Sequence, residues 1–222
     1  MIGVVLFPGT NCEQDVVEAI GHLGGSADIV WHGDRRLPGN VDAVVLPGGF
    51  AHGDYLRTGA IARFSPVMGP VTDFARSGGP VLGICNGFQI LCEAGLLPGA
   101  LQKNRGLKFV CAPTDVRVET SVTPVTASIT PGTVLRIPIN HFEGCFTCDP
   151  KTLAELRQED QVVFRYVDNP NGSIDDIAGV CSRERNVVGL MPHPERATHE
   201  ILGSTDGGQV LANLLAAVTA TG

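Results

Sequence analysis

Residues 80–93 read PVLGICNGFQILCE and place a strand, a tight turn and a helix in direct succession. The apolar run 80–84 predicts a buried strand, and residues 88–93 predict the beginning of a helix. Residues 83–87, Gly-Ile-Cys-Asn-Gly, have the pattern Gly-x-nucleophile-x-Gly with cysteine in place of serine. The two glycines leave room for a strained turn that lifts the Cys85 sulfur into a cleft at the carboxyl end of a sheet. There the unpaired amides at the start of the helix favour a thiolate.

The same alternation runs through the first half of the chain. Apolar, β-branched runs predict strands at residues 2–7, 28–32 and 41–46. Apolar residues at helical spacing predict one helix that Asn11 can cap and another at residues 67–76. Strands that alternate with helices in this way imply a parallel sheet covered by helices on both faces.

The second half of the chain has short strands that follow one another with turns between them. The strands are expected at residues 109–112, 115–119, 134–139, 161–167, 177–181 and 187–191, the last two as a closing hairpin, with a terminal helix at 210–218. Successive strands joined by turns favour antiparallel pairing. The sequence therefore predicts a single α/β domain over residues 1–222, with a mostly parallel open sheet flanked by helices and an antiparallel strand extension in the second half.

Composition excludes several classes of protein. Of the 222 residues, 43% are hydrophobic and 28 are glycine without a period of three, so the chain is neither disordered nor collagenous. The formal net charge is −7 and no dense Lys/Arg run is present, so nucleic acid is not expected as a partner. The spacing of the seven cysteines, the start of the chain and the lack of a long apolar stretch predict a cytoplasmic protein with reduced thiols and no membrane span.

A cysteine nucleophile needs a general acid–base, and residues 191–195 offer the best one. They read Met-Pro-His-Pro-Glu and directly follow a predicted strand, so His193 is expected at a carboxyl end, like Cys85. Glu195 is close enough in the chain to orient the His193 imidazole. Taken singly, a cysteine is more often structural and a histidine in a proline-rich loop is more often a surface residue. Their settings in this chain favour a Cys–His–Glu triad.

A carbonyl under attack also needs two N–H donors for its oxyanion. The first candidate is the amide of Asn86, directly after the nucleophile. The second is an amide of the turn Gly48-Gly49-Phe50, which ends a neighbouring strand. Alone, this Pro-Gly-Gly stretch would be an ordinary turn, so its role depends on the triad.

No metal or cofactor is expected in this chain. Residues 145–148 have C-x-x-C spacing, but no second ligand pair accompanies them and they lie outside any βαβ unit. Neither phosphate-binding glycine pattern is present, so ATP chemistry is expected in a partner. Cys12 is interpreted as a small packed residue under the turn after the first strand.

These motifs resemble the triad-type (class I) glutamine amidotransferases. The resemblance is carried by residues 83–89 (GICNGFQ), 47–49 (PGG) and 193–195 (HPE). Further stretches are similar to one branch of this family, the glutaminase subunits that supply ammonia to a separate synthetase in purine biosynthesis. These stretches are residues 7–13, 48–57, 169–173 and 191–196.

The resemblance implies a flavodoxin-like fold and a reaction. Cys85 would attack the side-chain amide of L-glutamine to give a γ-glutamyl thioester and ammonia, with His193 as acid and base and Glu195 holding its tautomer. The implied glutamine pocket consists of Gly48, Gly49, Phe50, Asn86, Gln89, Asn104 and Phe109. Ammonia would pass to the synthetase subunit, assisted by a small accessory subunit. That partner would use ATP and Mg²⁺ to convert formylglycinamide ribonucleotide to formylglycinamidine ribonucleotide.

The sequence departs from the family pattern at four positions, Gly106, Ala112, Phe142 and Cys145, which puts details of the glutamine pocket and of docking in question. His141 and Glu143 match the pattern and are candidates for supporting or partner-facing residues. Two alternatives stay open. One is a cysteine hydrolase of the same architecture that acts on another amide or thioester, and the other is a non-catalytic regulatory subunit. Release of ammonia from glutamine separates all three.

Overall fold

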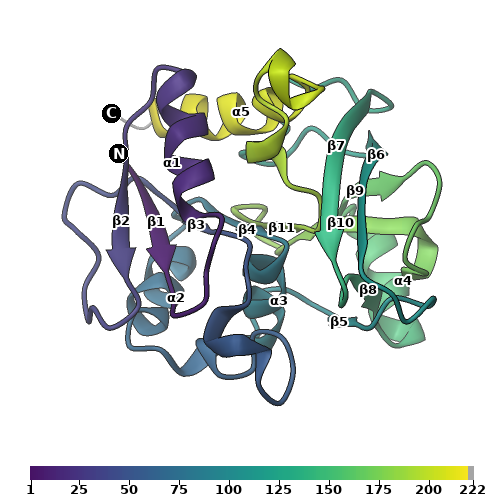
Figure 1. Cartoon of the computed structure of the whole chain (residues 1–222), viewed down its shortest axis with the longest axis horizontal. Helices are drawn as coiled ribbons and strands as arrows, with labels where there is room; N and C mark the ends of the chain where they lie inside the picture. The colour runs from purple at the N-terminus through teal and green to yellow at the C-terminus, as the bar shows by residue number, and fades with distance from the viewer. Residues whose placement is uncertain (220–222) are drawn as a thin grey trace.

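The computed structural model describes residues 1–219, and residues 220–222, the end of the predicted domain, lie outside the described part of the chain. Within residues 1–219, nine strands form one sheet (Figure 1). In spatial order they are β2 (Ala27–Trp31), β1 (Ile2–Leu6), β3 (Ala43–Leu46), β4 (Val81–Ile84), β11 (Val187–Leu190), β10 (Ile177–Cys181), β9 (Val162–Tyr166), β6 (Val110–Val118) and β7 (Val134–His141). A separate antiparallel pair joins β5 (Ala100–Gln102) to β8 (Cys145–Thr147).

The sheet is parallel on one side and antiparallel on the other. Strands β2, β1, β3, β4 and β11 run parallel to one another, and β10, β9, β6 and β7 follow in antiparallel pairing. Every residue of β3 and β4 is buried, as expected for strands between two helical layers. The predicted fold class, a mostly parallel open sheet with an antiparallel extension, is confirmed.

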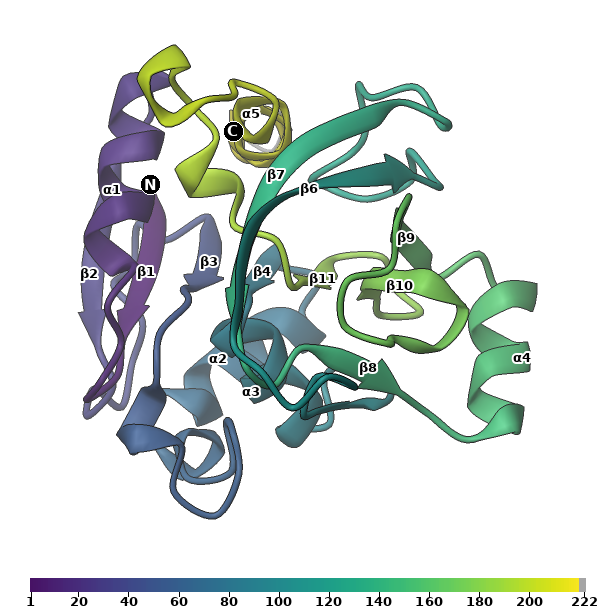
Figure 2. The ribbon, with the colours of Figure 1, turned by 45° about the vertical axis from the view of Figure 1, so that its right-hand side comes forward.

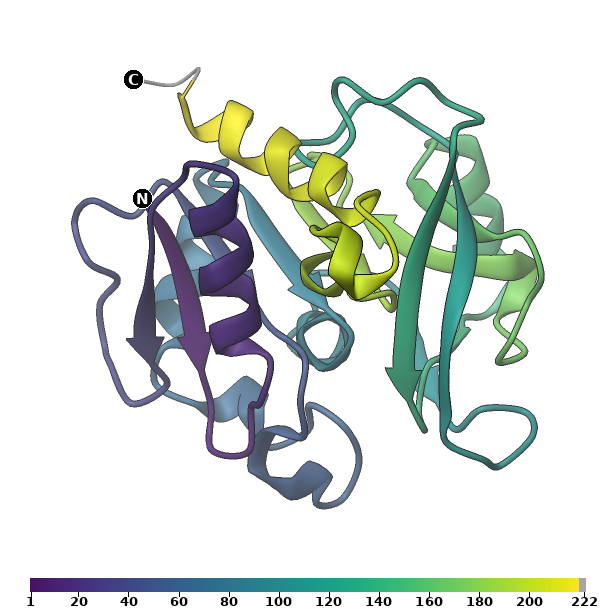
Figure 3. The same ribbon diagram turned by 45° about the horizontal axis from the view of Figure 1, so that its top comes forward.

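Helices cover both faces of the parallel strands. They are α1 (Glu13–His22), α2 (Met68–Arg76), α3 (Asn86–Glu93) and α5 (Gly207–Thr219), whereas α4 (Pro150–Gln158) lies at the antiparallel side of the molecule (Figure 2). Helices α1 and α5 lie together on one face, and α2 and α3 lie on the other (Figures 1 and 3). The terminal helix α5 begins three residues before the predicted start at residue 210.

The antiparallel extension forms the other side of the molecule. Figure 2 shows the long β6–β7 pair curving from the neighbourhood of α5 toward the small β5–β8 sheet. The end of β7 thereby reaches the start of α3, because the Asn140 carbonyl oxygen lies 3.8 Å from the Cys85 sulfur. The extension therefore supplies one wall of whatever site forms at Cys85.

The strand order places several loops at one edge of the sheet. The chain leaves β1 toward β2 on one side and later enters β3 on the other side of β1. Ligands of open α/β sheets bind at such a change of direction, outside the carboxyl ends of the strands. The carboxyl ends of β1, β3, β4 and β11 meet at this edge, because these strands are parallel.

The predicted break between residues 109–112 and 115–119 is wrong, because β6 runs without interruption from Val110 to Val118. Pro113 lies inside this strand, directly opposite Pro138 of β7. In an antiparallel pair, alternate residues direct their N–H groups away from the partner strand. Two facing prolines can occupy such a pair without removing a ladder hydrogen bond.

The starts of two helices, α1 and α4, differ from the sequence prediction. Asn11 does not cap α1, because Cys12 precedes the helix and no side chain caps it. Helix α4 was not predicted, although Asp149 and Pro150 form a standard start signal. The Asp149 carboxylate accepts hydrogen bonds from the amides of Lys151 and Thr152 at 2.9 and 3.1 Å.

Among the described residues, no helix is long and apolar enough to cross a membrane.

Close packing at the turn between β4 and α3 explains the glycines of the Gly-x-Cys-x-Gly motif. A Cβ atom at Gly87 would overlap the carbonyl oxygen of Leu46, so α3 packs directly on the end of β3. A Cβ atom at Gly83 would lie 2.8 Å from the Gly87 carbonyl carbon. Both contacts are shorter than normal van der Waals distances, as the sequence predicted.

Gly87→Ala should therefore destabilise the fold by about 3 kcal/mol, or prevent folding, because overpacking here pushes on backbone rather than on a flexible side chain. The matched control is Gly21→Ala in α1, where no atom lies within 4 Å of the new methyl group. This control should stabilise the protein by roughly 0.5–1 kcal/mol. Urea unfolding measures both, and a Gly87→Ala protein with wild-type stability would contradict the packing argument.

Candidate active site

Cys85 occupies the turn between β4 and α3 in a strained conformation. Its φ and ψ angles are 51° and −104°, and its side chain is buried. Non-glycine residues with positive φ are uncommon outside turns and functional sites. The Cys85 amide donates to the carbonyl of Leu190 at 2.8 Å, which ties the turn to the end of β11. The predicted elbow geometry is therefore present.

His193 and Glu195 form a buried pair beside this turn. They follow β11, and the 3₁₀ helix η4 (Pro194–Arg196) brings the Glu195 carboxylate to 2.6 Å from His193 Nδ1. The amide of His193 donates to the Pro138 carbonyl at 2.8 Å, which fixes the loop against β7. With Nδ1 bonded to Glu195, Nε2 is left for the reaction, and it has no hydrogen-bond partner among the described residues.

The electrostatics of the pair favour a protonated imidazole. Burial lowers the pKa of His193, but the charges of Glu195 and Cys85 outweigh burial and hold the pKa well above its ordinary value. The nearby thiols of Cys12 and Cys85 raise the His193 pKa further. A cationic imidazole that interacts with Cys85 is suited to hold a thiolate and then to donate a proton.

The turn after β3 provides a backbone donor next to the nucleophile. The Phe50 amide is not available to an oxyanion, because it donates to the Gly9 carbonyl at 2.9 Å. Among the described residues, the Gly49 amide donates no backbone hydrogen bond. Gly49 has φ +147°, and a Cβ atom there would lie 2.7 Å from the Asn11 nitrogen and the Thr10 Cα. The Gly48 amide donates no backbone hydrogen bond in residues 1–219 either, but of these two residues only Gly49 lines the cavity beside Cys85, so its amide is the one placed for an oxyanion.

A cavity of about 280 Å³ opens beside Cys85. Three of the predicted pocket residues line it with Cys85, namely Gly49, Phe50 and Gln89. The lining also includes residues that sequence reasoning did not place in the pocket, among them Asp54, Thr58, Asn140, His141, Phe142 and Glu143. A larger cavity of about 710 Å³ lies between α1 and the segment after η4, and Cys85 does not line it. The smaller cavity is therefore the candidate active site.

The side-chain carboxamides of Asn86 and Gln89 form hydrogen bonds within the protein. The Asn86 carboxamide accepts from the amide of Ala51 at 3.0 Å and donates to Gln89 Oε1 at 2.9 Å and Asp54 Oδ1 at 3.3 Å. The Gln89 nitrogen donates to the carbonyl of Glu143. Both ends of the Gln89 carboxamide thus have protein partners, so its position in the cavity is fixed by the loops it joins.

Asn104 does not line the cavity. It hydrogen-bonds to residues at both ends of the loop after β7, which does line the cavity. Its nitrogen donates to the carbonyls of Lys108 and His141 at 2.9 and 3.0 Å. Its oxygen accepts from the Gly144 amide at 3.2 Å and lies 3.0 Å from His141 Nδ1. Since this oxygen is an acceptor, Nδ1 of His141 carries the proton. The pKa of His141 falls to about 4, mainly through burial and also through the charge of His193, so the ring is neutral.

The other two predicted pocket residues also lie away from the cavity lining. Phe109 is 48% exposed and directly precedes β6. Gly48 instead packs against the His193 ring, because a Cβ atom there would lie 2.6 Å from the Cε1 atom of His193 and 3.2 Å from the Cys12 sulfur. The structure thus brings together the triad and part of the predicted pocket.

Cys12 is packed against the triad. Its sulfur lies 3.1 Å from Arg196 Nη2 and 3.2 Å from Asn11 Oδ1. One atom each of the Cys12, His193 and Glu195 side chains lie within 4.8 Å of one another, and among residues 1–219 this is the one group of three such side chains with the spacing to hold a metal ion. His193 Nδ1 is already bonded to Glu195, so these groups serve the triad.

Comparison with known proteins identifies the family. A family model described as a CobB/CobQ-like glutamine amidotransferase domain matches residues 1–211. The chain is 60% identical over 215 residues to phosphoribosylformylglycinamidine synthase subunit PurQ of Rubrobacter xylanophilus, covering 97% of both chains. This chain belongs to the PurQ family of glutamine amidotransferases. It is also 54% identical over 220 residues to PurQ of Synechococcus elongatus, covering 99% of both chains.

Solved structures agree with this assignment. The structure of PurLQS from Thermotoga maritima contains a chain with a TM-score of 0.89 and 41% identity, covering 97% of both chains. A putative GMP synthase subunit from Thermoplasma acidophilum has a TM-score of 0.66 at 17% identity and shows the fold alone. The chain is thus an enzyme subunit of the PurQ type, with the class I amidotransferase fold.

The Asn-Pro-Asn-Gly-Ser stretch at 169–173, which supported the resemblance to this family, has a structural role near the site. Asn171 Nδ2 donates to the Gly144 carbonyl at 2.8 Å, and the Ser173 hydroxyl accepts from the Phe146 amide at 2.9 Å. The stretch therefore holds the far end of the loop that follows β7 and His141.

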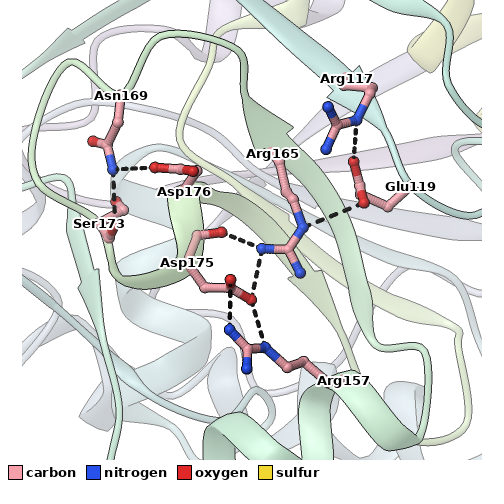
Figure 4. A network of polar contacts seen from close by, with 8 residues as sticks. All are labelled: Arg117, Glu119, Arg157, Arg165, Asn169, Ser173, Asp175 and Asp176. Carbon is pink, nitrogen blue, oxygen red and sulfur yellow. Dashed lines mark hydrogen bonds and ion pairs between the residues drawn. The ribbon is translucent and has the colours of Figure 1, made fainter.

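An ion-pair network anchors this stretch to the rest of the extension (Figure 4). Asn169 bonds to Ser173 and Asp176 within the turn. Asp175 pairs with Arg157 of α4 at 2.7 Å and with Arg165 of β9 at 2.6 Å. The Arg165 guanidinium also reaches Glu119, 3.3 Å away, which in turn pairs with Arg117 of β6.

The four departures from the family pattern affect the site unequally. Only Phe142 lines the cavity beside Cys85. Cys145 is half-buried in β8, Ala112 is half-buried in β6, and Gly106 is exposed. The departures leave the triad and the oxyanion donors unchanged.

Replacing Glu195 with glutamine tests the charge that raises the His193 pKa. The folded pKa lies above the unfolded value of 6.5, so the pair stabilises the fold fully below that pH and less as pH rises through the folded pKa. We expect Glu195→Gln to lose more stability, relative to wild type, near pH 6 than near pH 9, measured by urea unfolding. Glu184→Gln, at an exposed position, is the control. A stability difference that stays constant or grows with pH would contradict the assignment.

Proposed function

We propose that this chain hydrolyses L-glutamine to glutamate and ammonia through Cys85. The ammonia is delivered to a synthetase subunit that converts formylglycinamide ribonucleotide to formylglycinamidine ribonucleotide in purine biosynthesis. The observation that carries the proposal is the strained Cys85 beside the buried His193–Glu195 pair, at the base of a cavity in a chain of the PurQ family. The non-catalytic alternative is not favoured, because the triad is intact.

The residues divide the reaction into two steps. The Cys85 thiolate attacks the carboxamide carbon of glutamine, and the carbonyl oxygen takes up negative charge beside the amides of Gly49 and Asn86. His193 Nε2 then gives its proton to the leaving nitrogen, so the C–N bond breaks and ammonia and a γ-glutamyl thioester result. In the second step His193 takes a proton from water, the hydroxide attacks the thioester, and glutamate leaves as Cys85 becomes a thiolate again.

The ATP-dependent part of the reaction belongs to the synthetase. Neither phosphate-binding glycine pattern occurs in the sequence, and the synthetase would bind ATP and Mg²⁺. A solved relative comes from an assembly named PurLQS, which supports a complex with a synthetase subunit and a small accessory subunit. Cytoplasmic location remains a prediction from sequence.

Cys85→Ala should abolish glutamine-dependent synthesis in the assembled complex, since the thioester cannot form. Synthesis from added ammonium salt should remain, because that activity resides in the synthetase. Cys111→Ala, which removes an exposed thiol from β6, is the matched control and should retain both activities. Equal loss of both activities in Cys85→Ala would show that Cys85 is structural and that the ammonia-donor role is wrong.

We also propose that the loop at residues 50–57 contacts the synthetase. Its residues Phe50, Gly53 and Asp54 line the cavity, while Tyr55 and Leu56 are 73% and 89% exposed. A subunit that receives ammonia must cover the cavity mouth, and large exposed apolar side chains beside it mark a binding surface.

Leu56→Glu should weaken binding to the synthetase about tenfold or more, which co-elution of the two subunits measures. Glutamine-dependent synthesis should fall in parallel. The control is Ile201→Glu, because Ile201 is 88% exposed and lines the separate cavity beside α1. If both variants bind the synthetase equally well, the loop is not part of the interface.

A further inference from the structure

The cavity beside Cys85 carries two carboxylates that no cationic side chain neutralises. Asp54 belongs to the 3₁₀ segment η1 (Ala51–Asp54), and Glu143 lies in the loop after β7. Both line the cavity, and among the described residues neither forms an ion pair. Arg57, on the same loop as Asp54, is bonded to Glu93 instead.

The two carboxylates are close enough to affect each other. Burial, together with the charge of Glu143, raises the pKa of Asp54 to about 6, against the opposing effect of a hydrogen bond from Asn86. Like charges that face one cavity are costly unless a cation lies between them. No Lys or Arg is among the residues that line the cavity in residues 1–219, and the lining His141 is neutral. The cavity is therefore suited to a ligand that brings its own positive charge.

Glutamine has a positive charge at the end opposite its carboxamide. Gln89 lines the cavity, but both groups of its carboxamide are bonded to Asn86 and Glu143. With the carboxamide carbon at Cys85 and the oxygen at the Gly49 amide, the rest of the molecule extends into the cavity. The two unpaired carboxylates are the charged groups available there.

We propose that Asp54 and Glu143 bind the α-ammonium group of glutamine and act as specificity-determining residues. The inference rests on the proposed glutaminase function and assigns a subsite within the same cavity. Asp54 is held for this role, because Asn86 Nδ2 donates to its Oδ1 at 3.3 Å and so connects it to the start of α3. The position of Glu143 is set through its carbonyl, which accepts from Gln89.

The test compares glutamine with 4-carbamoylbutanoate, which has hydrogen in place of the α-ammonium group. In the complex with the synthetase, wild-type kcat/KM for ammonia release should be about 10- to 100-fold lower with the analogue than with glutamine. Asp54→Asn and Glu143→Gln keep size and polarity but remove charge. Each should lower kcat/KM for glutamine about tenfold and leave kcat/KM for the analogue nearly unchanged. Asp28→Asn, at an exposed position on β2, is the matched control and should behave like wild type.

The outcomes separate the inference from the proposed function. If the wild-type complex releases no ammonia from glutamine, the proposed function fails. If it does, but the wild type treats both substrates alike, the α-ammonium is not recognised and the inference is overturned without any variant. If kcat/KM of either variant falls equally for glutamine and for the analogue, that residue is structural and its part of the inference is overturned.

Discussion

The contact between Gly87 and the end of β3 is the constraint on which the site depends. Because a glycine at this position lets α3 touch the Leu46 carbonyl, the helix begins directly beside the neighbouring strand. The chain between β4 and α3 must then turn within one residue, and Cys85 takes a φ of 51° to do so. Such a conformation costs about 1–3 kcal/mol, and the surrounding sheet has to hold it. The same contact sets the turn after β3, with its Gly49 amide, next to the nucleophile.

Three buried asparagines hold the loops around this turn. Asn86 connects the loop carrying Asp54 to α3, Asn104 holds the loop after β7, and Asn171 holds the Gly144 end of that loop. A carboxamide both donates and accepts, so one short side chain can satisfy several buried backbone groups. Loops without regular structure thereby present backbone amides and carboxylates to the cavity in fixed positions. Pre-organised groups of this kind lose little freedom when the substrate binds.

Sequence patterns were sufficient where a local rule decides the structure, as for the parallel strands and the elbow at Cys85. The two strands predicted at residues 109–112 and 115–119 are one strand, and only the register with β7 shows that the missing N–H of Pro113 costs nothing there. Asn104 entered the predicted pocket through family resemblance, and the structure places it outside the cavity lining. Asp54 and Glu143 belong to loops far apart in the chain, so no spacing rule could pair them. Their proximity depends on tertiary structure, including the hydrogen bond that the Glu143 carbonyl accepts from α3.

The charges around the cavity bear on how glutamine is distinguished from glutamate. Glutamine is neutral overall, and its ammonium group balances the carboxylates of Asp54 and Glu143 in the cavity. Hydrolysis leaves that ammonium in place but converts the neutral carboxamide to a carboxylate, next to the Cys85 thiolate. His141 offers this new charge no cation, because its pKa near 4 keeps the ring neutral. The remaining imidazole, that of His193, already shares its charge with a carboxylate. Repulsion between like charges in a partly desolvated cavity therefore favours release of glutamate over its retention.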